Sequence, residues 1–199
     1  TDKTGTLTIP NKEVDFTKAD SLPLEVRERL KPHAREAMLQ LEGQGIDVWM
    51  MSGDKEEAAS YWASKAGIGH FESRCVPNDK EEKVRELQAD GKIVAMIGDG
   101  INDTQALALA DVSIAIGTGA DVAMDVAQVT LMTDDLMALP EAIKLSRKTV
   151  RMIWQNLFWA FVYNLVCIPL AAGFYSAVFH WNFEMNPMVG ALAMSLSSV

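Results

Sequence analysis

Cysteine and basic residues are both scarce in this sequence of 199 residues. It holds two cysteines, Cys75 and Cys167, and two thiols in dissimilar surroundings make no disulfide framework of the kind found in small secreted domains. Lysine and arginine number 18 against 27 acidic residues, which gives a formal charge of −9. Nucleic-acid binding depends on clustered basic side chains, so we expect no nucleic-acid partner.

A starting methionine and a secretion signal with a basic start and a short apolar core are also absent. The chain opens directly on a motif that is discussed below, and it stops within an apolar stretch. We therefore expect it to be a fragment of a longer protein. Its length suits one domain, or one domain with a small appendage.

Charge is almost absent from the last third of the chain. Glu184 is the only charged residue after Arg151, so residues 1–151 carry −8 and the last 48 residues carry −1. Residues 152–179 form a 28-residue run without a charge, and a bilayer-spanning helix needs about 20 apolar residues. We predict a membrane helix here. The alternative is a buried helix of a soluble protein, although such helices are rarely this long.

A second apolar stretch follows at residues 185–199 and is long enough for about three-quarters of a span. Arg147 and Lys148 lie before the first run and favour a start on the cytoplasmic side. We predict that residues 151–199 form a helical hairpin in the lipid of the plasma (inner) membrane, with its second helix truncated. Residues 1–150 would then be cytoplasmic.

Helix and strand patterns alternate through the remaining part of the chain. Apolar periodicity predicts helices at 30–41, 55–66, 79–89, 102–110, 120–126 and 135–151, and short strands at 48–51, 71–76, 92–97, 112–116 and 129–132. This alternation predicts an α/β domain with a parallel sheet that is covered on both faces. Sites in such sheets form at the carboxyl ends of the strands, so the chemistry should lie there.

The first candidate motif is Asp2-Lys3-Thr4-Gly5-Thr6-Leu7-Thr8. It offers a carboxylate beside small, hydroxylated and glycine residues with accessible backbone N–H groups. Such a carboxylate can attack a phosphorus atom and form an aspartyl phosphate. Seven specified residues rarely recur by accident, so this motif carries more weight than the others.

Three further motifs follow predicted strands or begin a predicted helix. Ser52-Gly53-Asp54 could hold a phosphoryl oxygen through a hydroxyl and a backbone amide. Lys80 could neutralise developing phosphate charge. Gly98-Asp99-Gly100-Ile101-Asn102-Asp103 offers two carboxylates suited to Mg²⁺. Each of these motifs alone has a structural alternative. Ser52-Gly53-Asp54 could be an ordinary turn, Lys80 a solvated helix residue, and residues 98–103 a loop with an Asn or Asp that caps a helix.

In this order the four motifs resemble the phosphorylation domain of P-type ATPases, a branch of the haloacid-dehalogenase-like (Rossmann-like) fold. The resemblance implies that residues 1–150 form this domain and that ATP phosphorylates Asp2. It assigns catalytic roles to Thr4, Ser52 and Lys80. The Mg²⁺ ligands that it implies are Asp2, Thr4, Asp99 and Asp103, and the phosphate or nucleotide contacts are Lys3, Thr4, Gly53, Asp54, Gly98, Gly100 and Asn102.

The predicted membrane helices indicate which ion such a pump would carry. Neither contains an Asp or Glu, which disfavours a hard cation. Met194 offers a thioether, a ligand that suits Cu(I), and it shares a helix face with Ser198. Tyr163-Asn164 with the Met194 segment is similar to the pair in the Cu(I)-exporting heavy-metal branch, which implies a Cu(I) site of Tyr163, Asn164, Met194 and Ser198, with a metallochaperone as a possible partner. The alternatives are packing residues, or a pump for Zn²⁺, Cd²⁺ or another metal.

One departure from the family leaves other functions open. Residues 9–20 stand where the family inserts an ATP-binding domain, and they are too few to fold as one. We therefore predict that the isolated chain neither hydrolyses ATP efficiently nor transports metal, and a non-catalytic remnant is an alternative. A membrane-tethered phosphatase on the same fold is another, although position 4 is Thr rather than the second acid that it would need.

Overall fold

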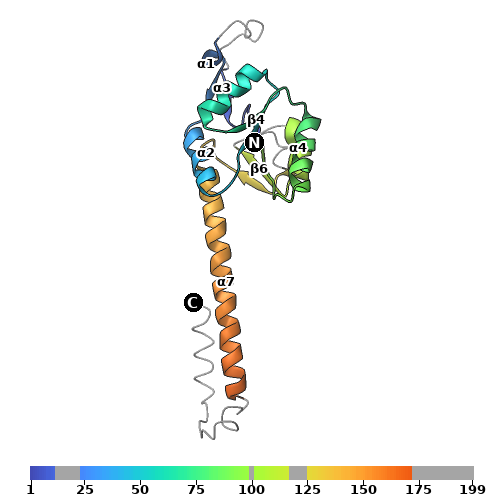
Figure 1. Ribbon diagram of the computed structural model, residues 1–199. Helices are drawn as coiled ribbons and strands as arrows, with labels where there is room; N and C mark the ends of the chain where they lie inside the picture. The colour runs from blue at the N-terminus through green and yellow to red at the C-terminus, as the bar shows by residue number, and fades with distance from the viewer. Residues whose placement is uncertain (12–22, 99–100, 117–124, 172–199) are drawn as a thin grey trace. The chain divides into compact units, whose positions relative to one another are not determined.

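The computed structural model describes residues 1–11, 23–98, 101–116 and 125–171 (Figure 1). The chain divides into two units, Thr1–Glu141 and Ala142–Val199. The predicted helix at 120–126 falls largely outside the described residues, as do Asp99, Gly100, Met194, Ser198 and the second predicted membrane helix.

Parallel strands form the centre of the first unit, as the alternation of elements predicted. One pair consists of β3 (Trp49–Met51) and β4 (His70–Glu72), and a second group has the order β5 (Ala95–Gly98), β6 (Val112–Ile116), β7 (Val129–Leu131). The backbone of Asp2 lies between the two groups. It forms a parallel bridge with Met51, and its N–H donates to the Ile97 carbonyl at 3.0 Å. Asp2 therefore stands at the carboxyl ends of β3 and β5.

An antiparallel pair was not expected from the sequence. β1 (Thr8–Pro10) pairs with β2 (Glu28–Leu30) in the register Thr8 with Leu30, and the short helix α1 (Leu24–Arg27) precedes β2. The helix predicted from Leu30 is therefore wrong at its start, because Leu30 is a strand residue and α2 begins at Ala34. The physical reason is Pro32, which disfavours helical backbone at the residue before it.

The remaining helices agree with the predicted periodicity to within a few residues. They are α2 (Ala34–Gly43), α3 (Glu56–Ala66), α4 (Pro77–Ala89), the 3₁₀ helix η2 (Ile101–Asp103) and α5 (Thr104–Leu109). Gly67 ends α3 with φ of 78°, a left-handed conformation that a residue with a Cβ adopts at a cost.

A buried apolar cluster joins α4, α5 and the sheet. Val84 of α4 is 1% exposed, Met96 of β5 is 1% exposed, and Leu107 of α5 is fully buried. Because close-packed interiors transmit small changes in shape, this cluster fixes the positions of the loops and helix ends beside it. These are the segments that carry Lys80 and Asp103.

The helix α7 (Ala138–Ala171) begins in the first unit, with Pro140 in its first turn, and continues without interruption through the predicted start of the membrane segment. Beyond Glu141, many of its apolar side chains are exposed, among them Ile153, Trp154, Leu157, Phe158, Phe161, Leu165 and Ile168. Over the described residues, no helix combines the length and hydropathy of a membrane span. The membrane hairpin stays a prediction.

Candidate active site

Three charged side chains from distant parts of the sequence meet beside the end of β3. Lys80 Nζ donates to Asp2 Oδ1 at 2.5 Å and to Asp103 Oδ1 at 2.6 Å. All three residues are buried, with exposed fractions of 7% for Asp2, 6% for Lys80 and 2% for Asp103. The structure thus places one ammonium group between two carboxylates.

Local structure explains why these three side chains converge. Asp2 is positioned by its backbone bridge to Met51, and Lys80 lies in the first turn of α4, which begins at Pro77. Asp103 ends η2 just before α5. Since α4 and α5 pack on each other through Val84 and Leu107, their starting turns are held near each other and near the sheet edge.

The pKa of Lys80 is raised above its ordinary value of 10.5. Burial opposes the charged form, but the charge of Asp2 and hydrogen bonds to Asp103 and Asp2 outweigh that effect. The ammonium therefore stays charged at physiological pH. A cation held at this place can neutralise negative charge that develops on a phosphoryl group at Asp2.

Ser52 follows β3 and is fully buried. Its backbone N–H donates to the Glu72 carbonyl at 2.9 Å, and its hydroxyl accepts a hydrogen bond from the Asp54 N–H at 3.1 Å. At the next position, a Cβ on Gly53 would lie 3.4 Å from the Cys75 carbonyl oxygen, so little space exists for a side chain. The Ser52-Gly53-Asp54 turn thus directly follows Met51, the residue that bridges Asp2, and its contact with phosphate stays a prediction.

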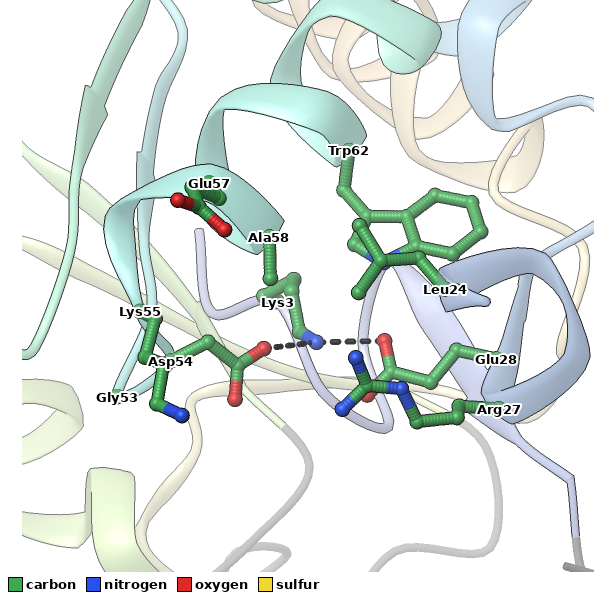
Figure 2. Close-up of a pocket in the computed structure, with 10 residues that line it drawn as sticks. All are labelled: Lys3, Leu24, Arg27, Glu28, Gly53, Asp54, Lys55, Glu57, Ala58 and Trp62. Carbon is green, nitrogen blue, oxygen red and sulfur yellow. Dashed lines mark hydrogen bonds and ion pairs between the residues drawn. The ribbon is translucent and has the colours of Figure 1, made fainter. Parts of the chain in front are cut away.

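Lys3 contacts two carboxylates (Figure 2), and its predicted contact with phosphate stays a prediction. Its side chain is buried, and Nζ donates to Glu28 Oε2 at 2.5 Å and to Asp54 Oδ2. Thr8 Oγ1 also donates to Glu28 Oε2, at 3.2 Å. Lys3 thus neutralises two carboxylates and joins the Ser52-Gly53-Asp54 turn to β2. Sequence reasoning missed Glu28, because no motif or periodicity marks it.

The other predicted site residues are placed as follows. Thr4 is exposed, and its backbone bridges Thr8. Asn102 is exposed in η2. Tyr163 and Asn164 lie on α7, with the Tyr163 ring 6.4 Å from that of Trp159. Because Met194 and Ser198 fall outside the described residues, the copper site stays a prediction.

Mg²⁺ prefers carboxylate oxygens, and Asp2 and Asp103 supply two carboxylates that both accept a hydrogen bond from Lys80. Among the described residues, no group of three or more His, Cys, Asp or Glu side chains comes together. The predicted third carboxylate, Asp99, lies outside them. The donor set that is present fits Mg²⁺, and the assignment of ligands stays a prediction.

Replacing Gly98 with alanine is expected to displace Asp103. The new Cβ would stand 2.7 Å from Asp103 Oδ2 and 2.9 Å from its Cβ. Asp103 is buried and hydrogen-bonded to Lys80, so overpacking here should cost about 1–3 kcal/mol of unfolding free energy. Urea unfolding of the purified chain measures this cost, with Gly69→Ala as the control because nothing lies within 4 Å of a Cβ at that position. Equal stability of the two variants would contradict the packing argument.

The fold and the site define a protein of the haloacid dehalogenase-like class. A family model described as haloacid dehalogenase-like hydrolase matches residues 13–111. Among solved structures, a zinc-transporting PIB-type ATPase in its E2.Pi state superposes with a TM-score of 0.72 and 29% identity, covering 85% of this chain and 26% of that one. The catalytic domain of a CPx-ATPase gives a TM-score of 0.55 at 36% identity, covering 59% of this chain and 46% of the other.

Curated relatives identify the family within the haloacid dehalogenase-like class. A probable copper-transporting ATPase of Synechocystis is 45% identical over 176 residues, which are 88% of this chain and 23% of the relative. A probable copper-importing P-type ATPase of Enterococcus hirae is 44% identical over 179 residues, with the same coverage. A copper-exporting P-type ATPase of Staphylococcus aureus is 44% identical over 176 residues, with 88% and 21% covered. Over most of its length the chain is therefore a relative of the heavy-metal P-type ATPases, as its motifs predicted, and it spans less than a quarter of these relatives.

Proposed function

We propose that this chain is the phosphorylation part of an ATP-driven Cu(I) export pump of a cell membrane. The observation that carries the proposal is the buried group of Asp2, Lys80 and Asp103 at the carboxyl ends of parallel strands. A nucleophile of known position, a fixed cation and a second carboxylate are the parts that phosphoryl transfer to an aspartate needs.

In the proposed reaction, an Asp2 carboxylate oxygen attacks the γ-phosphorus of ATP. The bond from that phosphorus to the oxygen of the leaving ADP breaks, and an aspartyl phosphate forms. Lys80 and the Ser52 turn bind the transferring oxygens. We expect Asp2, Asp99, Asp103 and the Thr4 backbone carbonyl to hold Mg²⁺, which neutralises phosphoryl charge when bound. Water then attacks phosphorus, which releases inorganic phosphate and restores Asp2.

Thr4 favours a pump over a membrane-tethered phosphatase. A phosphatase on this fold would need an acid two positions after the nucleophile to assist fast hydrolysis, and the Thr hydroxyl is too weak an acid and too weak a base for that proton transfer. A slowly hydrolysed phosphoenzyme lasts long enough to drive a change elsewhere in the protein. The uninterrupted helix α7 connects the end of the sheet with the predicted copper-binding segment.

The names of the curated relatives and the predicted membrane helices bear on the transported ion and the direction of transport. The names of the curated relatives specify copper, one as an importer and another as an exporter. The soft Met194 thioether and the absence of Asp and Glu from the predicted helices favour Cu(I) over Zn²⁺. We place Cu(I) at Tyr163, Asn164, Met194 and Ser198, with lipid around them and a metallochaperone as a candidate donor. A Zn²⁺ or Cd²⁺ pump is the second candidate, because the zinc-transporting structure aligns with 85% of the chain.

Labelled ATP tests this proposal in membranes that contain the full-length protein. We expect a phosphoenzyme that is sensitive to hydroxylamine, as an acyl phosphate should be, and that forms with Cu(I) but not with Zn²⁺. A label that follows Zn²⁺ would keep the enzyme class and overturn the metal. The absence of label from a folded protein would favour the non-catalytic remnant. We expect the isolated chain of 199 residues to show no copper-stimulated ATPase activity.

A further inference from the structure

The early turns of α7 carry four basic side chains on one face of the helix. Counted from Lys144, the other three follow at three, four and seven residues, a spacing that places all of them within about 100° of one another around the helix axis. All four residues are exposed. This set, called the basic face below, consists of Lys144, Arg147, Lys148 and Arg151.

The rest of α7 offers little negative charge to this face. Glu141, one turn before it, is the only acidic residue of the helix, and residues 142–171 contain no Asp or Glu. On the other side of the helix, the Thr149 hydroxyl is engaged locally, because it donates to the Leu145 carbonyl at 3.0 Å. Along its own helix, the basic face therefore concentrates positive charge at an exposed surface.

Exposed apolar residues follow the basic face directly. Met152, Ile153 and Trp154 are 52%, 59% and 68% exposed, and the helix continues past them to Ala171 without a charged residue (Figure 1). At about 1.5 Å per residue, this uncharged part of α7 extends about 30 Å, which matches the hydrocarbon core of a bilayer. Tryptophan is enriched where hydrocarbon meets headgroups. A bilayer that takes up the apolar part would therefore hold the basic face at the level of its headgroups.

Net charge also differs in sign between the two units of the chain. Thr1–Glu141 contains 14 basic and 26 acidic residues and carries −12, whereas Ala142–Val199 contains four basic residues and one acidic residue and carries +3. Anionic headgroups attract basic residues close to them and repel acidic ones, and both forces fall off within a Debye length of about 8–10 Å. The second unit is therefore the part of the chain whose charge complements an anionic lipid surface.

We propose that the basic face binds the phosphate groups of anionic phospholipids in the membrane that takes up α7. Its Lys and Arg side chains donate to phosphate oxygens, and each Arg can do so through two N–H groups at once. This contact goes beyond the bias that flanking basic residues exert on orientation, because it persists in the assembled protein and makes the surrounding lipid depend on headgroup charge. The inference rests on the membrane location in the proposed function and not on the phosphorylation chemistry.

Spin-labelled lipids measure this contact in vesicles that hold the purified chain of 199 residues. The association constant of labelled phosphatidylglycerol divided by that of labelled phosphatidylcholine reports the preference for an anionic headgroup. One basic residue near a membrane surface contributes roughly 5-fold to such an attraction, so we expect a ratio of about 5 or more for the wild type at about 0.1 M salt. The ratio should fall towards unity at about 1 M salt, where the Debye length is about 3 Å. It should also fall towards unity in the variant that combines Lys144→Gln, Arg147→Gln, Lys148→Gln and Arg151→Gln.

Two control variants separate charge at this face from other effects. The first exchanges Lys for Arg and Arg for Lys within the basic face, which keeps its charge, and should retain the wild-type ratio. The second makes the same change in net charge at exposed residues of the first unit and should also retain that ratio. Its substitutions are Arg29→Gln, Arg35→Gln, Lys65→Gln and Lys92→Gln. Equal ratios in the wild type and the basic-face glutamine variant would overturn the inference, as would an equal loss in the first-unit variant.

Flotation of the chain with vesicles distinguishes failure of this inference from failure of the proposed membrane location. If the wild type floats with zwitterionic vesicles but shows no headgroup preference, the membrane location is supported and the inference is overturned, which leaves solvent or an acidic protein surface at the basic face. If the wild type floats with neither zwitterionic nor anionic vesicles, both are overturned. If the basic-face glutamine variant still floats but loses the headgroup preference, both are supported.

Discussion

Replacing Asp2 with asparagine is expected to lower phosphoenzyme formation to the background of the labelling assay. The amide has nearly the same volume and can still accept a hydrogen bond from Lys80, which lies 2.5 Å from Asp2 Oδ1. It has no anionic oxygen to attack phosphorus. Removing the nucleophile of an enzyme that forms a covalent intermediate can reduce turnover on the order of 10⁶-fold. The measurement is acid-stable label from ATP and from acetyl phosphate in membranes that contain the full-length variant.

The matched control for this variant is Asp47→Asn. It makes the same chemical change at a side chain that is 75% exposed and whose nearest ion-pair partner is Lys92 at 4.0 Å. We expect wild-type labelling, since an exposed pair at this distance contributes little. Label that persists in Asp2→Asn would mean that another residue accepts the phosphoryl group. A melting temperature close to that of the wild type would show that lost labelling comes from lost chemistry.

Replacing Lys80 with methionine should be strongly destabilising. The change leaves Asp2 and Asp103 buried and facing each other without the cation that both now contact. Breaking a buried ion pair by removing one partner costs about 3–5 kcal/mol. Urea unfolding of the purified chain at neutral pH measures the loss. Lys65→Met serves as control, because Lys65 is 52% exposed and exposed ion pairs such as the one it forms with Glu25 contribute little to stability.

The Lys80 variant should also differ from the wild type in its dependence on pH. In the wild type, burial lowers the pKa of Lys80 but the charge of Asp2 and hydrogen bonds to Asp103 and Asp2 raise it further, so the folded pKa lies above 10.5. The ion pair therefore stabilises the fold fully below about pH 10.5, and its contribution is lost as pH rises through the folded pKa. In Lys80→Met, the repulsion between the Asp2 and Asp103 carboxylates is relieved when one of them is protonated. The loss of unfolding free energy relative to the wild type should therefore be smaller in acid.

A double variant distinguishes charge from packing. Adding Asp103→Asn to Lys80→Met removes one of the two unpaired charges while the volume barely changes. We expect part of the lost stability to return at neutral pH. A double variant that is less stable than Lys80→Met alone would show that packing around Lys80, rather than charge, causes the loss.

The sequence predicted the convergence of Asp2, Lys80 and Asp103 because each lies in a motif at the end of a strand or the start of a helix. In a parallel sheet those positions meet at one edge, so the register need not be known in advance.

Other features could not be predicted in this way. Glu28 reaches Lys3 only because β2 pairs antiparallel with β1, and three-residue strands carry too little pattern to reveal that register. Ala59, Trp62, Ala63 and Ala66 form the buried face of α3 at helical spacing. Nothing in that spacing reveals that the Trp62 N–H lacks a partner, because this depends on what lies opposite in space.

The β1–β2 pair has a consequence for how such a protein can change over evolutionary time. The chain leaves the site along Thr8–Pro10 and returns along Glu28–Leu30, and the Asn11 N–H donates to the Arg27 carbonyl at 2.7 Å. The two ends of the segment that connects β1 with β2 are thus held side by side by backbone hydrogen bonds, independently of the sequence between them. Each doubling of a connecting segment adds only about 0.6 kcal/mol of closure entropy. Lineages could therefore gain, exchange or shed an entire module at this junction while selection on the catalytic loops continued undisturbed.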